Sequence, residues 1–503
     1  MTGLNDKKGK VFLVGAGPGA PGLLTVRGRA VLSEAEVVVF DALANHSLLR
    51  YAPAQCEFID AGKRAGLHRL KQSEINELIV NKALEGNCVV RLKGGDPFLF
   101  GRGGEEAEAL EQAGVPYEVI PGISSAYAVP AYAGIPLTRR GSASAVHIFT
   151  AHHAAEDDVR DWTAAAHLGG TLVFLMGFER IGDIAAALIV AGMPPTTPAA
   201  VVQWGTTINQ RQVFSTLRSV AADVERAKLG APAVFVVGET AAESSRLHWM
   251  DELPFFGRTI AFTREERRAI PWLETFEGYG ARALDFPMVQ TKALVPDFES
   301  DAVLTSLPSF QWIVFTNSLG VEIFADAMRQ RGMDARSLAG IKIASVGLGT
   351  AQSLRQFGIN ADLIPTRMSQ EGLAAELPFA PAMRILLPGS PHMRGTIDRA
   401  AQEHGAEVVR LPLYESELVP ESRDELIEAL EAREINALVL VAPQVPQMLA
   451  QTRPHLNRLL EGVKVVCLGA QAATVLQEHR RPADAVLEQP TLEALVTVLR
   501  ELL

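Results

Sequence analysis

Cysteine is scarce in this chain, and long apolar runs are absent from it. The 503 residues include only Cys56, Cys88 and Cys467, which lie far apart and form no CxxC pair. We therefore predict no disulfide and no bound metal, because the spacing fits neither a disulfide framework nor a zinc site. No apolar stretch approaches the roughly 20 residues that span a bilayer, and residues 2–10 are too polar for a secretory signal. We expect a cytoplasmic protein without membrane contacts.

Basic residues are also fewer than acidic residues. Lys and Arg number 47 against 58 Asp and Glu, which gives a formal net charge of -11. This balance argues against nonspecific binding to nucleic acid, although it leaves room for a local basic pocket. Aromatic residues make up only 6 %, whereas Ala, Val and Leu are frequent. The composition is typical of an α/β protein, and the length predicts two or three domains.

Strand-like and helical runs alternate from the start of the chain, which predicts α/β layers. The expected strands cover residues 11–14, 37–40, 88–92, 172–176, 200–203 and 234–237. The segment DELPFF at 251–256 is interpreted as a linker, because Pro254 interrupts structure and a new strand follows at 259–263. We therefore expect one domain over 1–250 and a second over 257–503.

The second domain contains an internal repeat. SVGLGTAQSL at 345–354 resembles CLGAQAATVL at 467–476, an offset of 122 residues (467 − 345). The same offset relates two further pairs, Asp362 with Asp484 and Glu371 with Glu493. Three equal offsets predict two duplicated α/β lobes. Two such lobes facing each other would form a cleft at the carboxyl ends of their strands, where ligands of α/β sheets bind.

The run RLKGGDPFLFGRGGEE at 91–106 has no core periodicity and holds five glycines around Asp96. An expected strand at 88–92 ends abruptly there, and glycine permits backbone approaches that other residues do not. We expect this backbone to be shaped around a ligand. The alternative is an ordinary connection between a strand and a helix.

The opening segment VFLVGAGPGAPG at 11–22 places GxGxxA after a strand, with Asp41 about where a ribose-binding acid would lie. That pattern is typical of a dinucleotide site. However, Pro18 and Pro21 stand where the phosphate-binding helix should begin and continue, and proline removes needed donors. An extended loop is favoured, and a nicotinamide-dependent oxidoreductase remains the alternative.

Eight blocks within residues 10–245 resemble, in the right order, the uroporphyrinogen-III C-methyltransferases of the tetrapyrrole methylase family. The blocks are VGAGPG (14–19), LLT (23–25), FDAL (40–43), GKRAG (62–66), RLKGGDPFLFGRGGEE (91–106), PGISSA (121–126), AGIPLT (133–138) and TLVFLMG (171–177). The resemblance implies a two-lobed methylase fold and a homodimer. It also implies transfer of methyl groups from S-adenosylmethionine to uroporphyrinogen III, giving precorrin-2 for sirohaem or cobalamin. S-Adenosylhomocysteine is the expected second product.

The resemblance also implies roles for single residues. Asp41 is the expected carboxylate base, and its alternative is a helix-capping or loop acid after a strand. Lys63 is the expected proton donor, and its alternative is a surface residue that serves solubility. The expected methyl-donor pocket comprises Pro18, Gly94, Gly95, Asp96, Leu99, Ser124, Ser125, Met176 and Gly205. Met176 is alternatively an ordinary core methionine after a strand. Candidates for binding the carboxylates of the substrate are Arg64, Arg91, Arg102, Arg139 and Arg140.

Residues 257–503 resemble uroporphyrinogen-III synthase, which implies a two-lobed α/β fold that closes hydroxymethylbilane with inversion of one ring. The matching blocks are GRTIAFTR (257–264), WIVFTNSLGV (312–321), SVGLGTA (345–351) and LPLYES (411–416). Tyr414 matches a tyrosine implicated in the loss of water; its alternative is a strand-end aromatic residue. The expected substrate-binding residues are Thr316, Asn317, Ser318 and Thr350.

The chain departs from both patterns. In the first domain, Ala20 stands where an acid is usual, Arg139 replaces a histidine, and VVQWGT replaces VENGT. A later cobalamin-pathway methylase is the alternative there. In the second domain, VAPQ at 441–444 stands where a Thr-Ser pair is usual, and LLPGSPHMRG lacks the expected arginine after its proline. A noncatalytic tetrapyrrole-binding module is the alternative for this domain.

Overall fold

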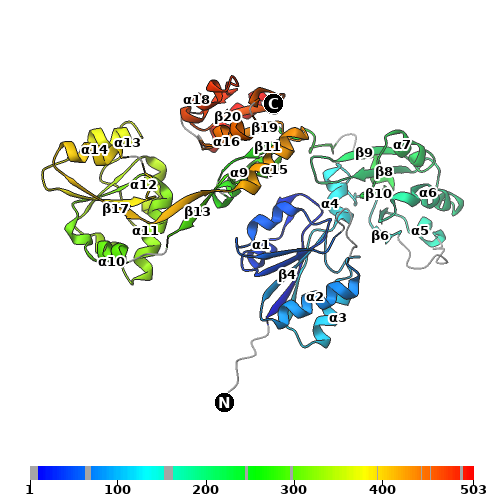
Figure 1. Ribbon diagram of the computed structural model, residues 1–503. Helices are drawn as coiled ribbons and strands as arrows, with labels where there is room; N and C mark the ends of the chain where they lie inside the picture. The colour runs from blue at the N-terminus through cyan, green and yellow to red at the C-terminus, as the bar shows by residue number, and fades with distance from the viewer. Residues whose placement is uncertain are drawn as a thin grey trace, which may run out of the picture. The chain divides into compact units, whose positions relative to one another are not determined.

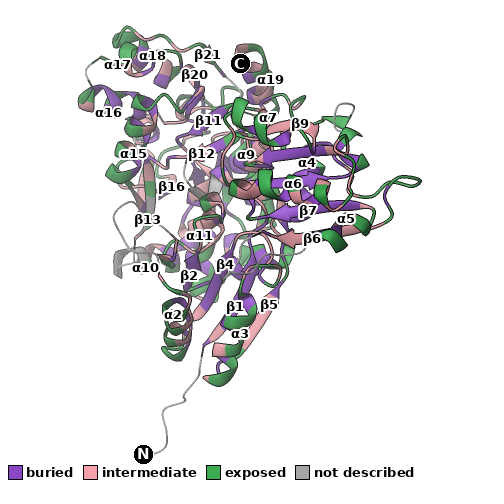
Figure 2. Ribbon diagram, turned by 90° about the vertical axis from the view of Figure 1, so that its right-hand side faces the viewer, coloured by how far each residue is buried: buried purple, intermediate pink, exposed green. Residues whose placement is uncertain are grey.

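The computed structural model describes residues 9–62, 70–151, 162–243, 247–264, 266–294, 298–393, 395–442, 444–453, 455–487 and 491–503. These residues form two compact units, one made of 1–286 with 425–503 and the other of 287–424. Both are α/β structures, and burial concentrates in the strands of their sheets (Figures 1 and 2). Within the described ranges, no helix is both long and apolar enough to cross a membrane.

The first sheet is parallel and has the order β3-β2-β4-β1-β5. Its strands are β1 (Lys10–Gly15), β2 (Val37–Phe40), β3 (Glu57–Asp60), β4 (Cys88–Lys93) and β5 (Tyr117–Ile120). Along β1, Phe12 and Val14 belong to the core on one face, whereas Val11 and Leu13 belong to the core on the other. Helix α1 (Val26–Leu32) contributes to the first core, and α2 (Gln72–Leu84) and α3 (Gly103–Gln112) contribute to the second. Burial on both faces explains the continuous apolar run of β1.

The second sheet is mixed and has the order β6-β7-β10-β8-β9. Its strands are β6 (Val146–Thr150), β7 (Thr171–Leu175), β8 (Pro198–Gln203), β9 (Arg211–Thr216) and β10 (Ala233–Val237). Helix α4 (Ser125–Tyr132) packs on one face, while α5 (Thr163–His167), α6 (Ile181–Val190) and α7 (Val220–Arg226) pack on the other. The six strands expected before residue 240 are confirmed to within two residues at each end.

The third sheet is parallel and combines two distant stretches of the chain, in the order β12-β11-β19-β20-β21. Its strands are β11 (Thr259–Phe262), β12 (Arg282–Asp285), β19 (Ala437–Leu440), β20 (Lys464–Cys467) and β21 (Ala485–Val486). The helices of these stretches are α9 (Glu266–Gly278), α16 (Gln444–Thr452), α17 (Leu456–Leu459), α18 (Ala470–Glu478) and α19 (Leu492–Leu502), and α15 (Pro420–Glu431) crosses the boundary between the two units at 424/425. Residues 287–424 are therefore an insertion between the two stretches that build this sheet.

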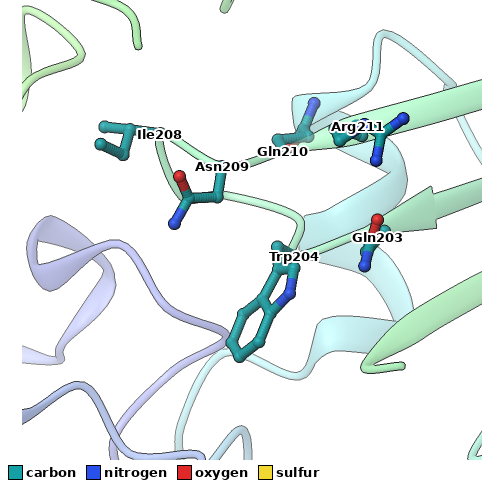
Figure 3. Close-up of a pocket in the computed structure, with 6 residues that line it drawn as sticks. All are labelled: Gln203, Trp204, Ile208, Asn209, Gln210 and Arg211. Atoms are coloured by element: carbon teal, nitrogen blue, oxygen red, sulfur yellow. The ribbon is translucent and has the colours of Figure 1, made fainter. Parts of the chain in front are cut away.

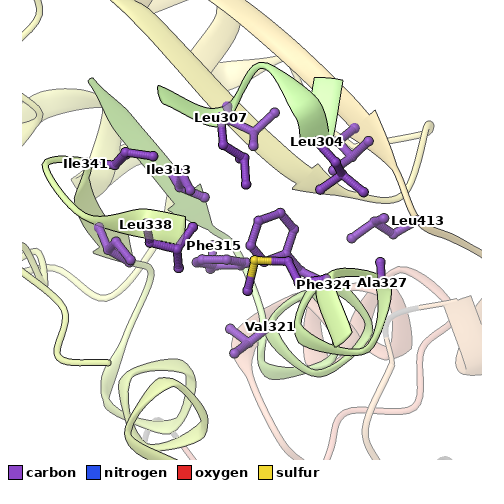
Figure 4. Close-up of a cluster of buried hydrophobic side chains, with 14 of the residues drawn as sticks. Leu304, Leu307, Ile313, Phe315, Val321, Phe324, Ala327, Leu338, Ile341 and Leu413 are labelled. Carbon is purple, nitrogen blue, oxygen red and sulfur yellow. The ribbon is translucent and has the colours of Figure 1, made fainter. Parts of the chain in front are cut away.

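The inserted unit has a parallel sheet of order β15-β14-β16-β17 and an antiparallel pair, β13-β18. The strands are β13 (Val289–Ala293), β14 (Trp312–Phe315), β15 (Lys342–Ser345), β16 (Arg384–Gly389), β17 (Glu407–Pro412) and β18 (Tyr414–Leu418). The helices are α10 (Phe298–Thr305), α11 (Ser318–Gln330), α12 (Leu348–Gln356), α13 (Gln370–Glu376) and α14 (Thr396–Glu403). Phe315 and Phe324 lie in its core (Figure 4). Their rings meet edge to face, with the ring centroids 5.5 Å apart.

The third and fourth sheets have the same local structure at the positions that the 122-residue offset pairs. Helices α12 and α18 are related by 122 residues at both ends (470 − 348 and 478 − 356). Asp362 Oδ2 accepts the Ile343 N–H at 2.7 Å, and Asp484 Oδ2 accepts the Val465 N–H at 2.8 Å. In each lobe, the equivalent aspartate thus accepts a hydrogen bond from the backbone of the equivalent strand.

Candidate active site

Three loops that contain glycine meet at the carboxyl ends of β1, β4 and β5. Gly17 and Gly95 form an antiparallel bridge, in which the Gly95 N–H donates to Gly17 O at 2.8 Å and the Gly17 N–H donates to Gly95 O at 3.2 Å. A Cβ atom added to Gly122 would lie 2.2 Å from Gly95 O, closer than any real contact. Gly95 itself has a φ of +69°, which glycine adopts without strain. The glycines therefore bring three backbone segments into direct contact, and we call this arrangement of Gly17, Gly95 and Gly122 the glycine cradle; binding of a ligand there stays a prediction.

Asp96 holds this cradle together through its side chain. Its Oδ1 accepts the N–H groups of Phe98 and Leu99 at 2.8 and 3.0 Å, and its Oδ2 accepts the N–H of Gly122 at 2.9 Å. Both carboxylate oxygens are therefore engaged by backbone donors of the loops after β4 and β5. Asp96 therefore fixes the backbone of these two loops, and its place in the donor pocket stays a prediction.

The start of α4 lies beside the same cradle. Ser124 is buried and caps the helix, with its Oγ accepting the Ala126 N–H at 3.2 Å. A Cβ atom on Gly95 would point at Ser124 Cα and Ser125 N from 4.0 Å. Leu99 packs against the core that α4 forms with the second sheet. The structure thus brings Gly95, Asp96, Leu99, Ser124 and Ser125 together, although they come from different elements.

The opening loop is extended, as its prolines predict. After β1 the chain bends at Pro18 and forms only a short 3-10 turn, η1 (Pro21–Leu23), before α1 begins at Val26. A Rossmann site places the pyrophosphate at a helix N-terminus directly after the first strand, and the chain has an extended loop there. The loop is held instead by the Ala20 N–H, which donates to Thr206 Oγ1 at 3.1 Å, and by Gly19 O, which accepts from Asn45 Nδ2 at 2.6 Å.

The connection between β8 and β9 has a strained backbone and borders a hollow of about 400 Å³. Trp204 and Thr206 have φ angles of 48° and 69°, and a side chain on the intervening Gly205 would overlap Val129 of α4. The hollow is lined by Gln203, Trp204, Ile208, Asn209, Gln210 and Arg211. Figure 3 shows Trp204 and Asn209 projecting from the connection, while Gln203 and Arg211 lie on the strands that flank it. Gly205, predicted for the donor pocket, is buried in this connection against Val129, and the next residue, Thr206, contacts Ala20; the role of Gly205 in donor binding stays a prediction.

Met176 follows β7 directly and is not a core residue. Its φ is 54°, and 54 % of it is exposed. The interpretation of Met176 as an ordinary core methionine is therefore wrong. A large apolar side chain held outward in a strained conformation at a strand end suits a ligand contact, and the predicted contact with the methyl donor stays a prediction.

Asp41 lies directly after β2, with a buried arginine behind it. Arg91 Nη2 donates to Asp41 Oδ1 at 2.5 Å, and the exposed fractions are 32 % for the Asp41 side chain and 2 % for Arg91. Arg91 Nε donates to Glu106, and its Nη1 donates to the carbonyl oxygens of Val39 and Leu92. The predicted binding of a substrate carboxylate by Arg91 would require this arrangement to open.

Lys93 extends the buried charges along β4. Its Nζ donates to Glu106 Oε1 at 2.8 Å, and both side chains are almost inaccessible. Burial and the neighbouring Arg91 guanidinium lower the pKa of Lys93, and the Glu106 carboxylate opposes that shift. Our reading of the sequence missed Lys93 and Glu106. A usable signal existed, because two cations alternate with valine and leucine in a strand whose faces are otherwise apolar.

The remaining predicted cations of the first domain that the structure describes lie at the surface. Arg102 makes a bidentate pair with Glu105 at 2.7 and 2.8 Å, Arg139 pairs with Glu243, and Arg140 is exposed. Lys63 and Arg64 lie outside the residues that the structure describes. The substrate contacts of these side chains stay predictions.

In the inserted unit, three of the predicted residues follow β14 directly, whereas Thr350 lies in α12 and Tyr414 begins β18. Asn317 caps α11, with its Oδ1 accepting the Gly320 N–H at 2.7 Å, and its Nδ2 donates to the Tyr414 hydroxyl at 2.6 Å. Thr316 contacts Met393 through its hydroxyl at 3.6 Å, Ser318 begins α11, and Thr350 is buried in α12. Tyr414 is only 4 % exposed and belongs to the core around Phe315. The structure therefore joins Tyr414 to Asn317, and the catalytic role of Tyr414 stays a prediction.

Comparison with known proteins gives two family matches on this chain. The profile of tetrapyrrole (corrin/porphyrin) methylases matches residues 10–221, and that of uroporphyrinogen-III synthase HemD matches residues 271–497. A porphyrin biosynthesis protein HemD of Ruminiclostridium josui is 32 % identical over 98 % of both chains. An S-adenosyl-L-methionine-dependent uroporphyrinogen III methyltransferase of Methanosarcina barkeri is 50 % identical over 47 % of this chain and 93 % of its own length.

Among solved structures, the uroporphyrin-III C-methyl transferase of Thermus thermophilus complexed with S-adenyl homocysteine is 38 % identical. It covers 46 % of this chain and 99 % of its own length, with a TM-score of 0.41.

A glycine cradle at strand ends, joined along one chain to further α/β sheets, defines a multidomain α/β protein. The chain belongs to the tetrapyrrole methylase family through residues 10–221 and to the uroporphyrinogen-III synthase family through residues 271–497. It is thus a methyltransferase fused to a synthase of tetrapyrrole biosynthesis.

Proposed function

We propose that the first domain methylates uroporphyrinogen III twice to give precorrin-2, with S-adenosylmethionine as donor, and that the second domain makes uroporphyrinogen III from hydroxymethylbilane. The observation that carries the methylase half is the glycine cradle of Gly17, Gly95 and Gly122 beside the partly exposed Asp41. The synthase half is supported by the relative that matches over the whole chain.

The residues present suit the proposed donor. S-Adenosylmethionine supplies an electrophilic methyl group on a sulfonium ion, and its adenosine is uncharged. A pocket of glycine backbone and carbonyl oxygens fits such a molecule better than a phosphate-binding helix N-terminus. The space in front of Gly95, bounded 4.0 Å away by Ser124 and Ser125, is one that a side chain would fill. The residues that would hold the donor are Pro18, Gly94, Gly95, Leu99, Ser124, Ser125, Met176 and Gly205, with Asp96 fixing their loops.

Asp41 is the proposed base. Methylation of a pyrrole carbon leaves a cationic macrocycle that must lose a proton, and a positioned carboxylate accepts it. Asp41 combines access to solvent with a fixed position, because Arg91 binds one of its oxygens from inside the sheet. Lys63 is the proposed proton donor. The exposed cations Arg102, Arg139 and Arg140, together with Arg64, are the proposed partners of the substrate's eight carboxylates.

In the second domain, Tyr414 is proposed to assist the departure of water from hydroxymethylbilane. The Asn317 Nδ2 donates to its oxygen, so the phenolic proton is directed away from Asn317. Thr316, Ser318 and Thr350 are the proposed binding residues around it. A noncatalytic tetrapyrrole-binding module is the second candidate, because Tyr414 is buried in the core of its lobe.

Product analysis with the full-length protein tests the proposal. Hydroxymethylbilane and S-adenosylmethionine are supplied together, and the macrocycle is identified by chromatography and mass spectrometry. We expect precorrin-2. Unmethylated type III macrocycle would contradict the methylase assignment, whereas type I macrocycle would contradict the synthase assignment and favour the binding module. Uroporphyrinogen III supplied directly is the control, because its methylation does not depend on the second domain.

From the same family resemblance we propose that the enzyme is a cytoplasmic homodimer. The molecular mass of the purified protein in solution tests the dimer.

A further inference from the structure

Four charged side chains, the proposed base Asp41 and three residues behind it, are linked by hydrogen bonds. Arg91 Nη2 donates to Asp41 Oδ1 at 2.5 Å, Arg91 Nε donates to Glu106 Oε1 at 3.1 Å, and Lys93 Nζ donates to the same oxygen at 2.8 Å. The exposed fractions of the side chains are 32 % for Asp41, 2 % for Arg91, 0 % for Glu106 and 3 % for Lys93. Asp41 is thus the one member of this chain of contacts that reaches the surface appreciably.

Burying these charged side chains in a core is energetically unfavourable. Removing a charge from water costs several kcal/mol, and buried ion pairs can often be replaced by apolar residues without loss of stability. The neighbours of Arg91 and Lys93 along β4 are such residues, since Val89, Val90 and Leu92 are fully buried. Two cations and two carboxylates cancel in charge, so the cluster is tolerated, but packing alone does not require it. A role at its accessible end accounts for its presence.

Contacts through Glu106 fix the position of the Arg91 side chain. Glu106 Oε1 accepts from three donors, namely Arg91 Nε, Lys93 Nζ and Gln72 Nε2, the last at 3.1 Å. These donors come from β4 and α2, while Glu106 lies in the first turn of α3. The planar guanidinium uses its Nε edge for Glu106 and its Nη2 for Asp41, so the position of one carboxylate sets the position of the other.

We propose that Arg91 is a positioning residue that holds the Asp41 carboxylate for proton abstraction, with Glu106 and Lys93 as its buried anchor. This inference rests on the proposed role of Asp41 as the base. Arg91 acts through Asp41, and it touches neither substrate nor methyl donor.

Arg91→Lys separates this role from general stability. Lysine keeps the positive charge, but a single ammonium lacks the fork that reaches Asp41 and Glu106 at once. We expect the rate constant of methyl transfer to fall about tenfold or more, as for other misplaced catalytic groups, while the dissociation constant of S-adenosylhomocysteine changes by less than about twofold. Arg410→Lys is the matched control. Arg410 makes a bidentate pair with Asp398 at 2.8 and 2.9 Å in the inserted unit, and its substitution should leave methyl transfer unchanged.

A double-mutant cycle with Asp41→Asn gives the decisive readout, because a merely structural role would not produce its result. In single-turnover assays, Arg91→Lys should reduce the rate in the parent background and change it by less than about twofold in the Asp41→Asn background. Independent, multiplying effects would overturn the positioning role. Parent-like methylation by Asp41→Asn alone would instead overturn Asp41 as the base, which is the failure of the proposed function.

Crystal structures of the parent and Arg91→Lys proteins with S-adenosylhomocysteine give a second test that needs no residual activity. The Asp41 carboxylate should be displaced in the variant, while the loop of Gly95 and Asp96 keeps its position. An Asp41 carboxylate in its parent position, together with a reduced rate, would contradict the proposal.

Discussion

The two aspartates of the methylase site show how one residue type serves two purposes. Asp96 has both oxygens engaged by backbone N–H groups of Phe98, Leu99 and Gly122, so it fixes a loop. Asp41 has one oxygen bound by Arg91 and remains partly exposed, so it can exchange a proton with a ligand. Backbone N–H groups can fill the hydrogen-bonding capacity of a carboxylate, so a carboxylate bound in this way needs no ligand. The difference between the two residues therefore lies in the folded loops around them.

Met176 allows a test at the level of a single side chain. Met176→Ala should weaken binding of S-adenosylhomocysteine by about tenfold, equivalent to roughly 1.4 kcal/mol, and barely change the thermal stability, because the side chain is exposed before the ligand binds. Isothermal titration calorimetry and thermal unfolding measure the two effects.

Met328→Ala is the matched control for that substitution. Met328 is 4 % exposed in the core of the inserted unit, and its truncation should cost about 2–5 kcal/mol of unfolding free energy. Affinity for S-adenosylhomocysteine should stay unchanged in this variant. An affinity of Met176→Ala within twofold of the parent would remove Met176 from the proposed pocket.

Local composition made some site residues predictable and others not. The glycines of 91–106 could be placed near a ligand because their density has no packing explanation. Arg91 was expected at the substrate, yet it is buried, since its partners Asp41 and Glu106 belong to β2's end and α3. Pairing between elements decides whether an arginine faces inward, and a linear pattern does not contain that information.

At the scale of elements, Asp362 and Asp484 are a matched pair, because each accepts a backbone hydrogen bond from a strand of its own lobe. Asp484 accepts the Val465 N–H, as Asp362 accepts the Ile343 N–H. Asp484→Ala should remove about 1 kcal/mol of local protection from the Val465 amide and leave Ile343 unchanged. Asp362→Ala should do the reverse, and hydrogen exchange read by NMR measures both. Equal loss at both amides in either variant would argue for global destabilisation.

The pH dependence of the same contact has a definite sign. Burial alone would raise the pKa of Asp484, but the Val465 N–H and the Arg481 guanidinium outweigh it, so the pKa lies below its usual value. A carboxylate with a depressed folded-state pKa contributes stability above its unfolded pKa of about 3.9, and that contribution is lost as the pH falls through the folded value. Protection of the Val465 amide should accordingly decline below about pH 4 in the parent, and Asp484→Ala should show a flatter profile.

At the scale of the whole molecule, the two lobes of the second domain share a sheet order but not a chain order. Strands β20, β19, β11 and β12 lie in the same sequence across their sheet as β15, β14, β16 and β17. The last two strands precede the others along the chain in one lobe and follow them in the other. The 122-residue offset could therefore reveal only the part of each lobe that has kept its order. Alternation of strands and helices predicted the fold class, because it depends on local periodicity alone.

This topology makes a prediction about removing a lobe. Val289 of β13 and Leu418 of β18 are antiparallel register partners, so their Cα atoms lie about 4.5–5.5 Å apart. Replacing residues 290–417 by a linker of about two residues should therefore close the chain without strain. The shortened protein should keep methylation within about twofold of the parent and lose cyclisation, and hydrogen exchange should still protect β11.

A chain ending at Asp424 is the contrasting variant, and it decides whether the distant stretches depend on each other. It lacks β19, whose residue Ala437 pairs with Ile260 of β11, and it lacks Val439 and Val466 from the core around Phe262. With one edge of β11 unpaired and its core exposed, residues 259–285 should lose protection from exchange. Equal protection of β11 in both variants would contradict the dependence of these strands on residues 425–503. Loss in both would instead show that the inserted unit is needed to fold the lobe into whose sequence it is inserted.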